Sequence, residues 1–232
     1  MAGEINFCHR SLTDVVADCY DVALQIAKRA DETGSKEINL FYLRNGGTFP
    51  GETVFLILTE ILGYNVKTYT PQYEKYGEGR VGKKAMLNKA TALTIEQKKE
   101  VVNGINKGNL TVILDELIDQ GTTMHQAFED ISVYDKEVGL TYDQNMLSTM
   151  LFGAVLNRKT PYRFGVRRDH PLKKRILQMH SSFDAPPSWL TFPWETESSH
   201  YDSNLDKMIY HSGGNLEPLR EYIRPLISHF KR

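Results

Sequence analysis

The sequence is poor in several features that mark whole classes of protein. Among its 232 residues are only two cysteines, Cys8 and Cys19, without Cys or His partners at the spacing of a metal site. A disulfide framework is therefore excluded, and a zinc site has no support. The formal net charge is −1, so no sequence-wide basic field favours nucleic acid as a partner.

Long apolar runs are missing as well. No window approaches the roughly 20 apolar residues of a membrane span, and the opening MAGEINFCHRSL lacks the charged-then-apolar layout of a signal peptide. We therefore expect an intracellular, cytoplasmic protein without a membrane partner. Hydrophobic residues make up 41% and charged residues 25%, which is ordinary globular composition. The length fits a single catalytic domain spanning residues 1–232.

Helical and strand patterns alternate along the chain. Ser11 to Ala30 has apolar residues at helical spacing and a capping box of Ser11 and Asp14, which predicts an amphipathic helix. Further helices are expected at 51–63, 94–107 and 216–230, the last interrupted by Pro225, and strands at 38–43, 64–70, 110–114 and 147–156.

This alternation predicts an α/β fold with a mainly parallel, twisted sheet flanked by helices. We expect a core at about 11–160, a further region at about 161–200, and a C-terminal helix at about 214–230. Residues 181–195 are rich in Pro, Ser and aromatics, which indicates an irregular loop on the ligand side.

The end of one predicted strand carries the strongest chemical signal. The segment Val112 to Met124 reads VILDELIDQGTTM, with Asp115 and Glu116 directly after the apolar strand residues. Adjacent carboxylates can accept hydrogen bonds from the vicinal hydroxyls of a ribose or hold a hydrated divalent cation. The glycine turn and helix start that follow offer N–H groups to a phosphate. The plainer alternative is that the acids only end a strand and Thr122 caps a helix.

A second glycine loop follows the first predicted strand. Leu43 to Gly51 reads LRNGGTFPG, in which the adjacent glycines do not fit a dinucleotide-binding fingerprint. Adjacent glycines let backbone approach a ligand closely, and the guanidinium of Arg44 suits a pyrophosphate oxygen.

The first segment resembles the phosphoribosyl-pyrophosphate signature of the type I phosphoribosyltransferases, and is closest to the 6-oxopurine branch that acts on hypoxanthine, guanine and xanthine. The resemblance implies that Asp115 and Glu116 hold the ribose hydroxyls. Asp119 stands where this branch has an aspartate beside the purine N7, which implies that Asp119 is the catalytic residue. The 5′-phosphate would be bound by Gln120, Gly121, Thr122 and Thr123, and Asp119 would also belong to the binding site for phosphoribosyl pyrophosphate. Gln120 departs from the threonine usual there.

The second loop resembles the pyrophosphate-binding loop of the same family, which implies that Arg44, Asn45, Gly46 and Gly47 bind pyrophosphate. The basic residue lies one place early, so either Arg44 still reaches the pyrophosphate or Asn45 replaces it with neutral hydrogen bonds. Family members hold a strained non-proline cis peptide in this loop.

Two further segments complete the expected site. Tyr73 to Lys89 is rich in glycine and charge, which predicts a mobile lid that excludes water. The run WLTFPWE from Trp189 to Glu195 resembles a segment of bacterial xanthine and guanine transferases. It implies that residues 161–200 form a small hood and base pocket, that Trp189 stacks on the base, that Leu190 supplies backbone contacts and that Glu195 lies near the metal or the purine edge. Arg158 and Lys159 compete for the purine O6, and Lys159 is preferred.

The resemblance as a whole implies a Mg²⁺-dependent phosphoribosyltransferase that transfers phosphoribosyl from phosphoribosyl pyrophosphate to a purine-type base in nucleotide salvage. The metal ligands would be Asp115, Glu116 and Glu195. We also expect a homo-oligomer, either a dimer or a tetramer. The alternatives are a non-catalytic sensor of phosphoribosyl pyrophosphate or nucleotide, and a transferase with a non-purine acceptor.

Overall fold

The computed structural model describes residues 7–74, 86–118, 122–143, 150–158, 177–180, 184–185, 189–195 and 201–231. Within these ranges the α-helices are α1 (Leu12–Thr33), α2 (Thr48–Leu56), α3 (Ile95–Asn106), α4 (Thr122–Ile131), α5 (Tyr134–Val138), α6 (Ser203–Tyr210) and α7 (Glu217–Ile227). A π-helical turn, Ile57–Ile61, continues α2, and short 3-10 helices lie at Lys89–Thr91 and Ser228–Phe230. None of the described helices is both long and apolar enough to cross a membrane.

The strands are β1 (Phe7–His9), β2 (Glu37–Tyr42), β3 (Asn65–Tyr69), β4 (Tyr73–Glu74), β5 (Met86–Leu87), β6 (Leu110–Ile118), β7 (Met150–Arg158), β8 (Leu177–His180), β9 (Asp184–Ala185) and β10 (Trp189–Thr191). The central sheet has the order β3-β2-β6-β7-β8, and β9 also pairs with β7. Each of these pairs is parallel. The predicted α/β fold with a parallel sheet is confirmed.

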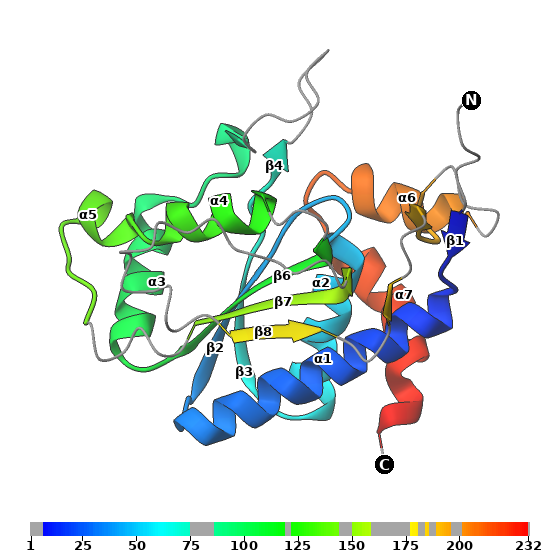
Figure 1. Ribbon diagram of the computed structural model, residues 1–232, viewed down its shortest axis with the longest axis horizontal. Helices are drawn as coiled ribbons and strands as arrows, with labels where there is room; N and C mark the ends of the chain where they lie inside the picture. Colours follow the sequence, from blue (N-terminus) through cyan, green and yellow to red (C-terminus); the bar gives the residue numbers. More distant parts are fainter. Residues whose placement is uncertain are drawn as a thin grey trace.

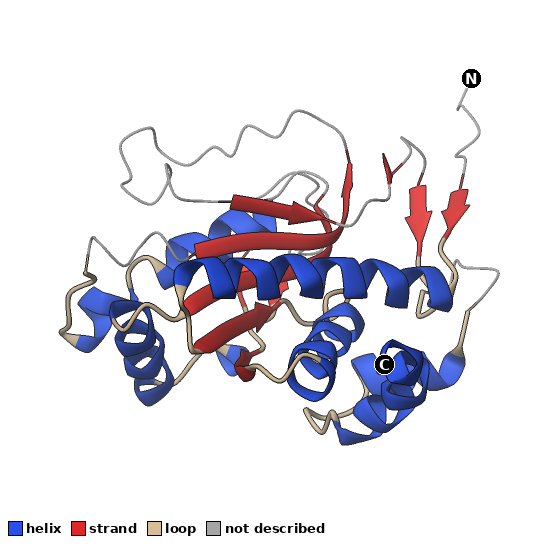
Figure 2. Ribbon diagram, turned by 90° about the horizontal axis from the view of Figure 1, so that it is seen from below, coloured by secondary structure: helices blue, strands red, loops and turns tan. Residues whose placement is uncertain are grey.

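Helices cover both faces of the central sheet (Figures 1 and 2). Alternate residues of a strand point to opposite faces. Leu40 of β2 and Val112 of β6 therefore pack in a buried cluster with α1, α2 and α7. Phe41 and Ile113, the next residue along each strand, pack in a second buried cluster with α3 and α4. This two-sided burial explains why β2 and β6 read as nearly continuous apolar runs.

Local sequence signals set the helix boundaries. Ser11 caps α1 through the predicted capping box with Asp14, and Gly34 ends the helix with φ 65°. Thr94 and Gln97 form a second capping box at the start of α3. The helix expected to start near Gly51 begins at Thr48 instead, directly after the glycine loop.

The hood contains a strand pair that the sequence patterns did not predict. β1 pairs in parallel with β10, and Cys8 stands opposite Leu190. Figure 1 shows β1 and α6 on the side toward which the arrows of β6, β7 and β8 point. The segment expected to be an irregular loop at 181–195 therefore includes the hood strand β10, and its partner comes from the N-terminal end of the described chain.

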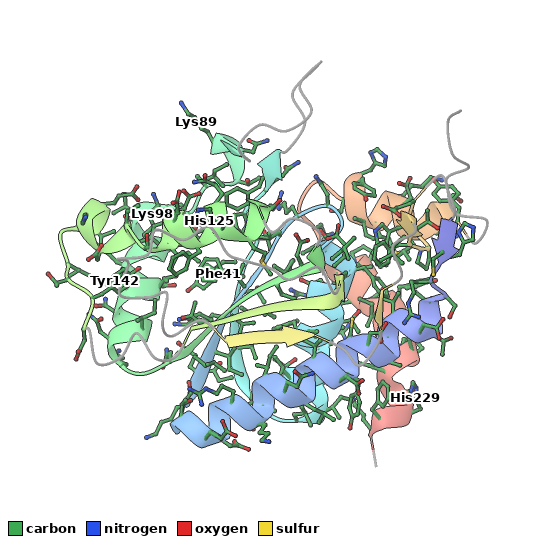
Figure 3. The ribbon with its side chains drawn as sticks, in the orientation of Figure 1. Phe41, Lys89, Lys98, His125, Tyr142 and His229 are labelled. Atoms are coloured by element: carbon green, nitrogen blue, oxygen red, sulfur yellow. The ribbon has the colours of Figure 1, made fainter. Side chains whose placement is uncertain are left out.

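Residues 133–143 pack on the helical layer formed by α3 and α4. Lys98 of α3 pairs with Glu137 of α5 at 2.6 Å, and the Tyr142 hydroxyl donates to the Ile131 carbonyl at 2.5 Å. Figure 3 shows Lys98 and Tyr142 on the side of the molecule away from β1 and α6. The described part of this segment thus extends the cover over α3 and α4.

A buried carboxylate ties the C-terminal helix to α2. Glu52 is fully buried, and its carboxylate accepts hydrogen bonds from the Tyr42 hydroxyl and from Arg220 Nε, the latter at 2.6 Å. The guanidinium of Arg220 also lies 4.9 Å from the centre of the Phe55 ring. Burial, with the nearby Glu52 charge second, raises the pKa of Tyr42. The hydroxyl therefore stays protonated and remains a donor to Glu52.

We predict that Arg220→Met lowers the free energy of unfolding by about 2–3 kcal/mol, because it leaves the charge of buried Glu52 without its cation. Arg224→Met is the matched control four residues along α7. Arg224 pairs with Glu60 and Glu217 at the surface, so this change should cost less than about 1 kcal/mol. Urea denaturation of both variants measures the two losses of unfolding free energy. Equal losses would show that the buried Glu52–Arg220 pair contributes no more to stability than the surface pairs of Arg224.

Candidate functional site

The site is built where two adjacent parallel strands end. Leu40 and Tyr42 of β2 stand opposite Val112 and Leu114 of β6, so both strands end at the same edge of the sheet. From β2 the chain continues to β3 on one side, whereas β6 lies on the other. Such a switch in strand order leaves a crevice at the carboxyl ends, where ligands bind in open α/β sheets.

The glycine loop after β2 touches the carboxylates of β6. The loop is joined to β6 by a hydrogen bond from Leu43 N to the Leu114 carbonyl at 3.0 Å. A Cβ atom at Gly46 would come within 2.1 Å of Glu116 Oε1, and one at Gly47 within 3.1 Å of Asp115 Oδ1. The sequence predicted that these two segments share one site, and the structure brings them into contact.

One carboxylate oxygen of the pair has no partner. Glu116 Oε2 is buried and accepts no hydrogen bond within the described part of the protein. Asp115 is oriented by a hydrogen bond from Glu116 N to its Oδ1 at 3.0 Å. Both residues are half-buried and belong to β6, which extends beyond the predicted strand end at Leu114. A buried, unpaired carboxylate oxygen is costly unless something else supplies a donor or a cation.

Arg44 is hydrogen-bonded to the segment that follows β3. Its Nε donates to Thr70 Oγ1 at 3.2 Å, and its backbone N donates to the Pro71 carbonyl at 3.0 Å. With Gly214 and other residues it lines a small cavity of about 30 Å³ between the loop and the α6–α7 connection. The guanidinium of Arg44 is therefore held at the end of β3.

Asn45 provides the bend of the loop. Its φ of 74° is positive, and among the described residues no other non-glycine residue has a positive φ. Asparagine tolerates this conformation better than most residues. The described residues contain no cis peptide bond, so the cis peptide implied by the resemblance is not found in this loop.

The phosphate turn lies only partly in the described chain. Asp119, Gln120 and Gly121 fall outside it. Thr122 is the first residue of the ten-residue helix α4, and Thr123 is half-buried beside it. The amino end of α4 therefore follows the acidic strand directly, as predicted.

The expected base-binding residues are less well gathered. Lys159 lies outside the described residues, and only the backbone of Trp189 is described, in β10. The Leu190 side chain is 4% exposed and packs in the core. Trp194 is the buried indole, stacked on Phe192 with ring centroids 5.0 Å apart, and its Nε1 has no hydrogen-bond partner among the described residues.

Glu195 closes a tight turn. Its Oε2 accepts a hydrogen bond from Phe192 N at 2.8 Å, and its backbone N donates to the Phe192 carbonyl at 3.0 Å. Within the described ranges no group of three or more His, Cys, Asp or Glu residues is close enough to hold a metal ion. The structure therefore does not bring Glu195 together with Asp115 and Glu116 as a metal site.

The support behind the site was not predicted. Tyr42 is the last residue of β2, and its bond to Glu52 braces the strand end against α2 and, through Arg220, against α7. Glu52 and Arg220 are 168 residues apart in the sequence. The only local signal is an isolated acid in an apolar helix, which does not identify a partner.

The fold and the site define an α/β protein with an acidic strand end and a glycine loop at its switch point. No family model matches the chain, and no curated protein is similar to it in sequence. Solved structures that match include hypoxanthine phosphoribosyltransferases, from the branch that the sequence motifs resemble. One is the Trypanosoma cruzi enzyme, with 14% identity, a TM-score of 0.48, and coverage of 76% of this chain and 77% of that one.

A second match is a variant of the Trypanosoma cruzi enzyme with its ternary substrates, at 14% identity and a TM-score of 0.46, covering 71% of this chain and 76% of that one. A third is an asparagine mutant of an invariant aspartic acid in a hypoxanthine phosphoribosyltransferase, at 13% identity and a TM-score of 0.46, covering 71% and 74%. We base the function on the residues of this chain.

We predict different outcomes for alanine at the two adjacent glycines. A methyl group at Gly46 meets the end of the flexible Glu116 side chain, whereas one at Gly47 would lie 2.4 Å from the Leu43 carbonyl oxygen. Gly46→Ala should therefore cost about 1 kcal/mol or less, and Gly47→Ala about 2–3 kcal/mol because backbone must shift. Urea denaturation of both variants measures this. A larger cost at Gly46 would contradict the loop geometry.

Proposed function

We propose that this protein is a phosphoribosyltransferase that joins the phosphoribosyl group of phosphoribosyl pyrophosphate to a ring nitrogen of a purine-type base. The observation that carries the proposal is the contact between the strand-end acids and the glycine loop, in which Glu116 Oε2 is buried and unpaired. An ionised carboxylate only accepts hydrogen bonds, so ribose hydroxyls suit it as donors.

Each part of the site then has a separate task. The carboxylates of Asp115 and Glu116 hold the ribose hydroxyls, and the side-chain-free backbone of Gly46 and Gly47 approaches the pyrophosphate. The amino end of α4, at Thr122 and Thr123, offers N–H groups and hydroxyls to the 5′-phosphate. These three groups come from the ends of β2 and β6 and from the helix that follows β6.

The reaction breaks the bond from C1 of the sugar to the pyrophosphate oxygen and forms a bond from C1 to the base nitrogen, which loses its proton. Positive charge develops on the ribose as the leaving group departs. The two carboxylates stabilise this charge, because their own charge is fixed by the strand and needs no reorganisation. Asp119, in the proposed turn, would accept the proton near the purine N7 or orient the base.

Asp115 and Glu116 also suit a magnesium ion. Carboxylate oxygens are preferred Mg²⁺ ligands, and such sites often combine one or two carboxylates with substrate phosphates. When bound, the ion would neutralise charge on the departing pyrophosphate. Glu195 has no part in this arrangement, since its carboxylate is used in the turn with Phe192.

The base would be held from the hood. We place Trp189 against the heterocycle, with the backbone of Leu190 and the side chain of Lys159 at its edge. β10 pairs with β1, so the backbone that carries Trp189 is held by a second strand. The lid predicted at 73–89 would close over the site from the β4–β5 pair, whose strands are antiparallel.

One assay tests the activity directly. The protein is incubated with phosphoribosyl pyrophosphate, Mg²⁺ and, separately, guanine, xanthine, hypoxanthine, adenine, uracil or orotate, and released pyrophosphate is measured. We expect turnover with at least one 6-oxopurine. Tight binding of phosphoribosyl pyrophosphate without turnover on any base would favour a sensor, and turnover only with a pyrimidine would correct the acceptor class.

The double variant Asp115→Asn/Glu116→Gln should lower kcat/KM for phosphoribosyl pyrophosphate by about 100-fold or more, because it removes charge without changing shape. A matched adjacent pair, Asp31 and Glu32, lies exposed near the end of α1. The control Asp31→Asn/Glu32→Gln should leave kcat/KM unchanged. Equal losses in both variants would count against the assignment.

Asp119→Asn should lower kcat by about 100-fold while the dissociation constant for phosphoribosyl pyrophosphate changes little, since the side chain is assigned to the base. Steady-state kinetics and calorimetric titration separate the two effects. A parallel loss of binding and turnover would instead assign Asp119 to the sugar phosphate.

A further inference from the structure

A second cavity lies at the amino ends of the central strands, whereas the glycine loop lies at their carboxyl ends. Its volume is about 580 Å³, and it forms where β2 and β3 begin and where α1 and α3 end. In Figure 1 this edge is at the lower left, where β2 starts, away from α6 and β1. A volume of this size is in the range of small-molecule sites.

The sheet face beneath α3 is polar at this end. Glu37 stands opposite Asn65, and Asn39 stands between Lys67 on one side and Thr111 on the other. Asn39 and Thr111 are buried, and their side chains are hydrogen-bonded at 3.3 Å. The carboxyl halves of the same strands are apolar on this face, with the rings of Phe41 and Tyr69 stacked 4.7 Å apart.

A sheet face under a helix is normally apolar. If the polar side chains of this face served packing alone, we would expect them to form hydrogen bonds only with one another. Glu37 meets that expectation, because its carboxylate accepts from Asn109 Nδ2 at 2.8 Å and Asn65 Nδ2 at 3.0 Å and lies 3.4 Å from Lys67 Nζ.

Other polar side chains around the cavity are exposed to solvent and are not used in bonds within the described chain. The side chains of Lys36, Asn103 and Lys107 line it and make no hydrogen bond or ion pair within the described chain.

The charges around the cavity nearly cancel. Lys36, Lys67 and Lys107 contribute three positive charges, and Glu37 and Glu100 contribute two negative ones. The carboxyl ends of α1 and α3 also reach the cavity, at Gly34 and Lys107, and each carries about half a negative charge. A strongly charged ligand is therefore not favoured.

The unused groups include both donors and acceptors. Lysine ammonium and asparagine N–H groups donate, whereas the Glu100 carboxylate and amide oxygens accept. A hydroxyl group both donates and accepts, so one ligand class can satisfy all of them. The lining residues include no aromatic side chain, so a heterocycle would find no ring to stack on.

We propose that this cavity binds a small, neutral, hydroxyl-rich molecule of the sugar or polyol class, held by Lys36, Asn103 and Lys107 around the polar face of β2 and β3. The site lies at the other edge of the sheet from the acidic strand end, so it does not depend on the proposed transferase activity.

The test uses ribose as the probe and the full chain carrying Asp115→Asn/Glu116→Gln, which removes the ribose contacts of the other site. Binding is followed by the side-chain amide signals in ¹H–¹⁵N spectra. We expect saturable shifts of the amide signals of Asn65, Asn103 and Asn109. Replacement of Asn103 by Trp, which fills the cavity from α3, should weaken binding at least tenfold.

Asn204→Ala is the matched control, since Asn204 is an exposed helical asparagine on α6. It should leave ribose binding unchanged, and Asn103→Trp should keep the melting temperature of its parent. Absence of saturable shifts, or equal affinity in the Asn103→Trp variant, would overturn the proposal. Ribose 5-phosphate binding more than tenfold tighter than ribose, with that gain lost in Lys36→Ala/Lys107→Ala, would overturn the neutral class of the ligand.

Discussion

The close approach of a glycine loop to two carboxylates is the constraint on which the candidate site depends. β2 and β6 are adjacent and parallel, so the segments that follow them must share the space at one edge of the sheet. The space left for a Cβ atom at Gly46 is already occupied by Glu116, and at Gly47 by the backbone of Leu43. At Gly46 the Glu116 side chain would have to move aside, whereas at Gly47 the backbone itself would have to shift, so Gly47 is the position that requires glycine.

The same contact leaves one buried carboxylate oxygen of the site without a hydrogen-bond donor in the described protein. Glu116 Oε2 is removed from water without a hydrogen bond in the described protein, and this lowers stability unless a ligand supplies a donor. The surrounding structure is correspondingly rigid. Tyr42, at the end of β2, is fixed by buried Glu52, and Glu52 is fixed by Arg220. A destabilised group held by a stable frame is typical of sites whose polar atoms are reserved for a ligand.

Sequence patterns predicted what depends on neighbours in the chain. Ser11 with Asp14 marked the start of α1, because a capping box needs residues only three apart. Apolar runs identified the central strands, and their shared edge followed from the parallel order. The segments of the site were therefore found without knowledge of any distance.

Contacts between distant segments could not be predicted in this way. β1 is three residues long, too short for a periodic signal, and its pairing with β10 joins segments 182 residues apart. The Glu52–Arg220 pair is likewise invisible until α7 is placed on α2. The sequence also suggested that Glu195 approaches the metal, whereas its carboxylate closes its own turn at Phe192. Local chemistry identifies what a side chain can do, and tertiary packing decides whether it is free to do it.

The two edges of the sheet share the strands that connect them. β2 begins at Glu37, which belongs to the polar cavity, and ends at Tyr42, which supports the glycine loop. In the middle of this strand the side chains change on one face from Asn39 to Phe41, so a polar region passes directly into an apolar one. Because β2 is held between β3 and β6 throughout its length, a shift at its start cannot be absorbed by a flexible connection. Any ligand that moved the start of β2 would therefore act on the same rigid element that positions Gly46 and Gly47.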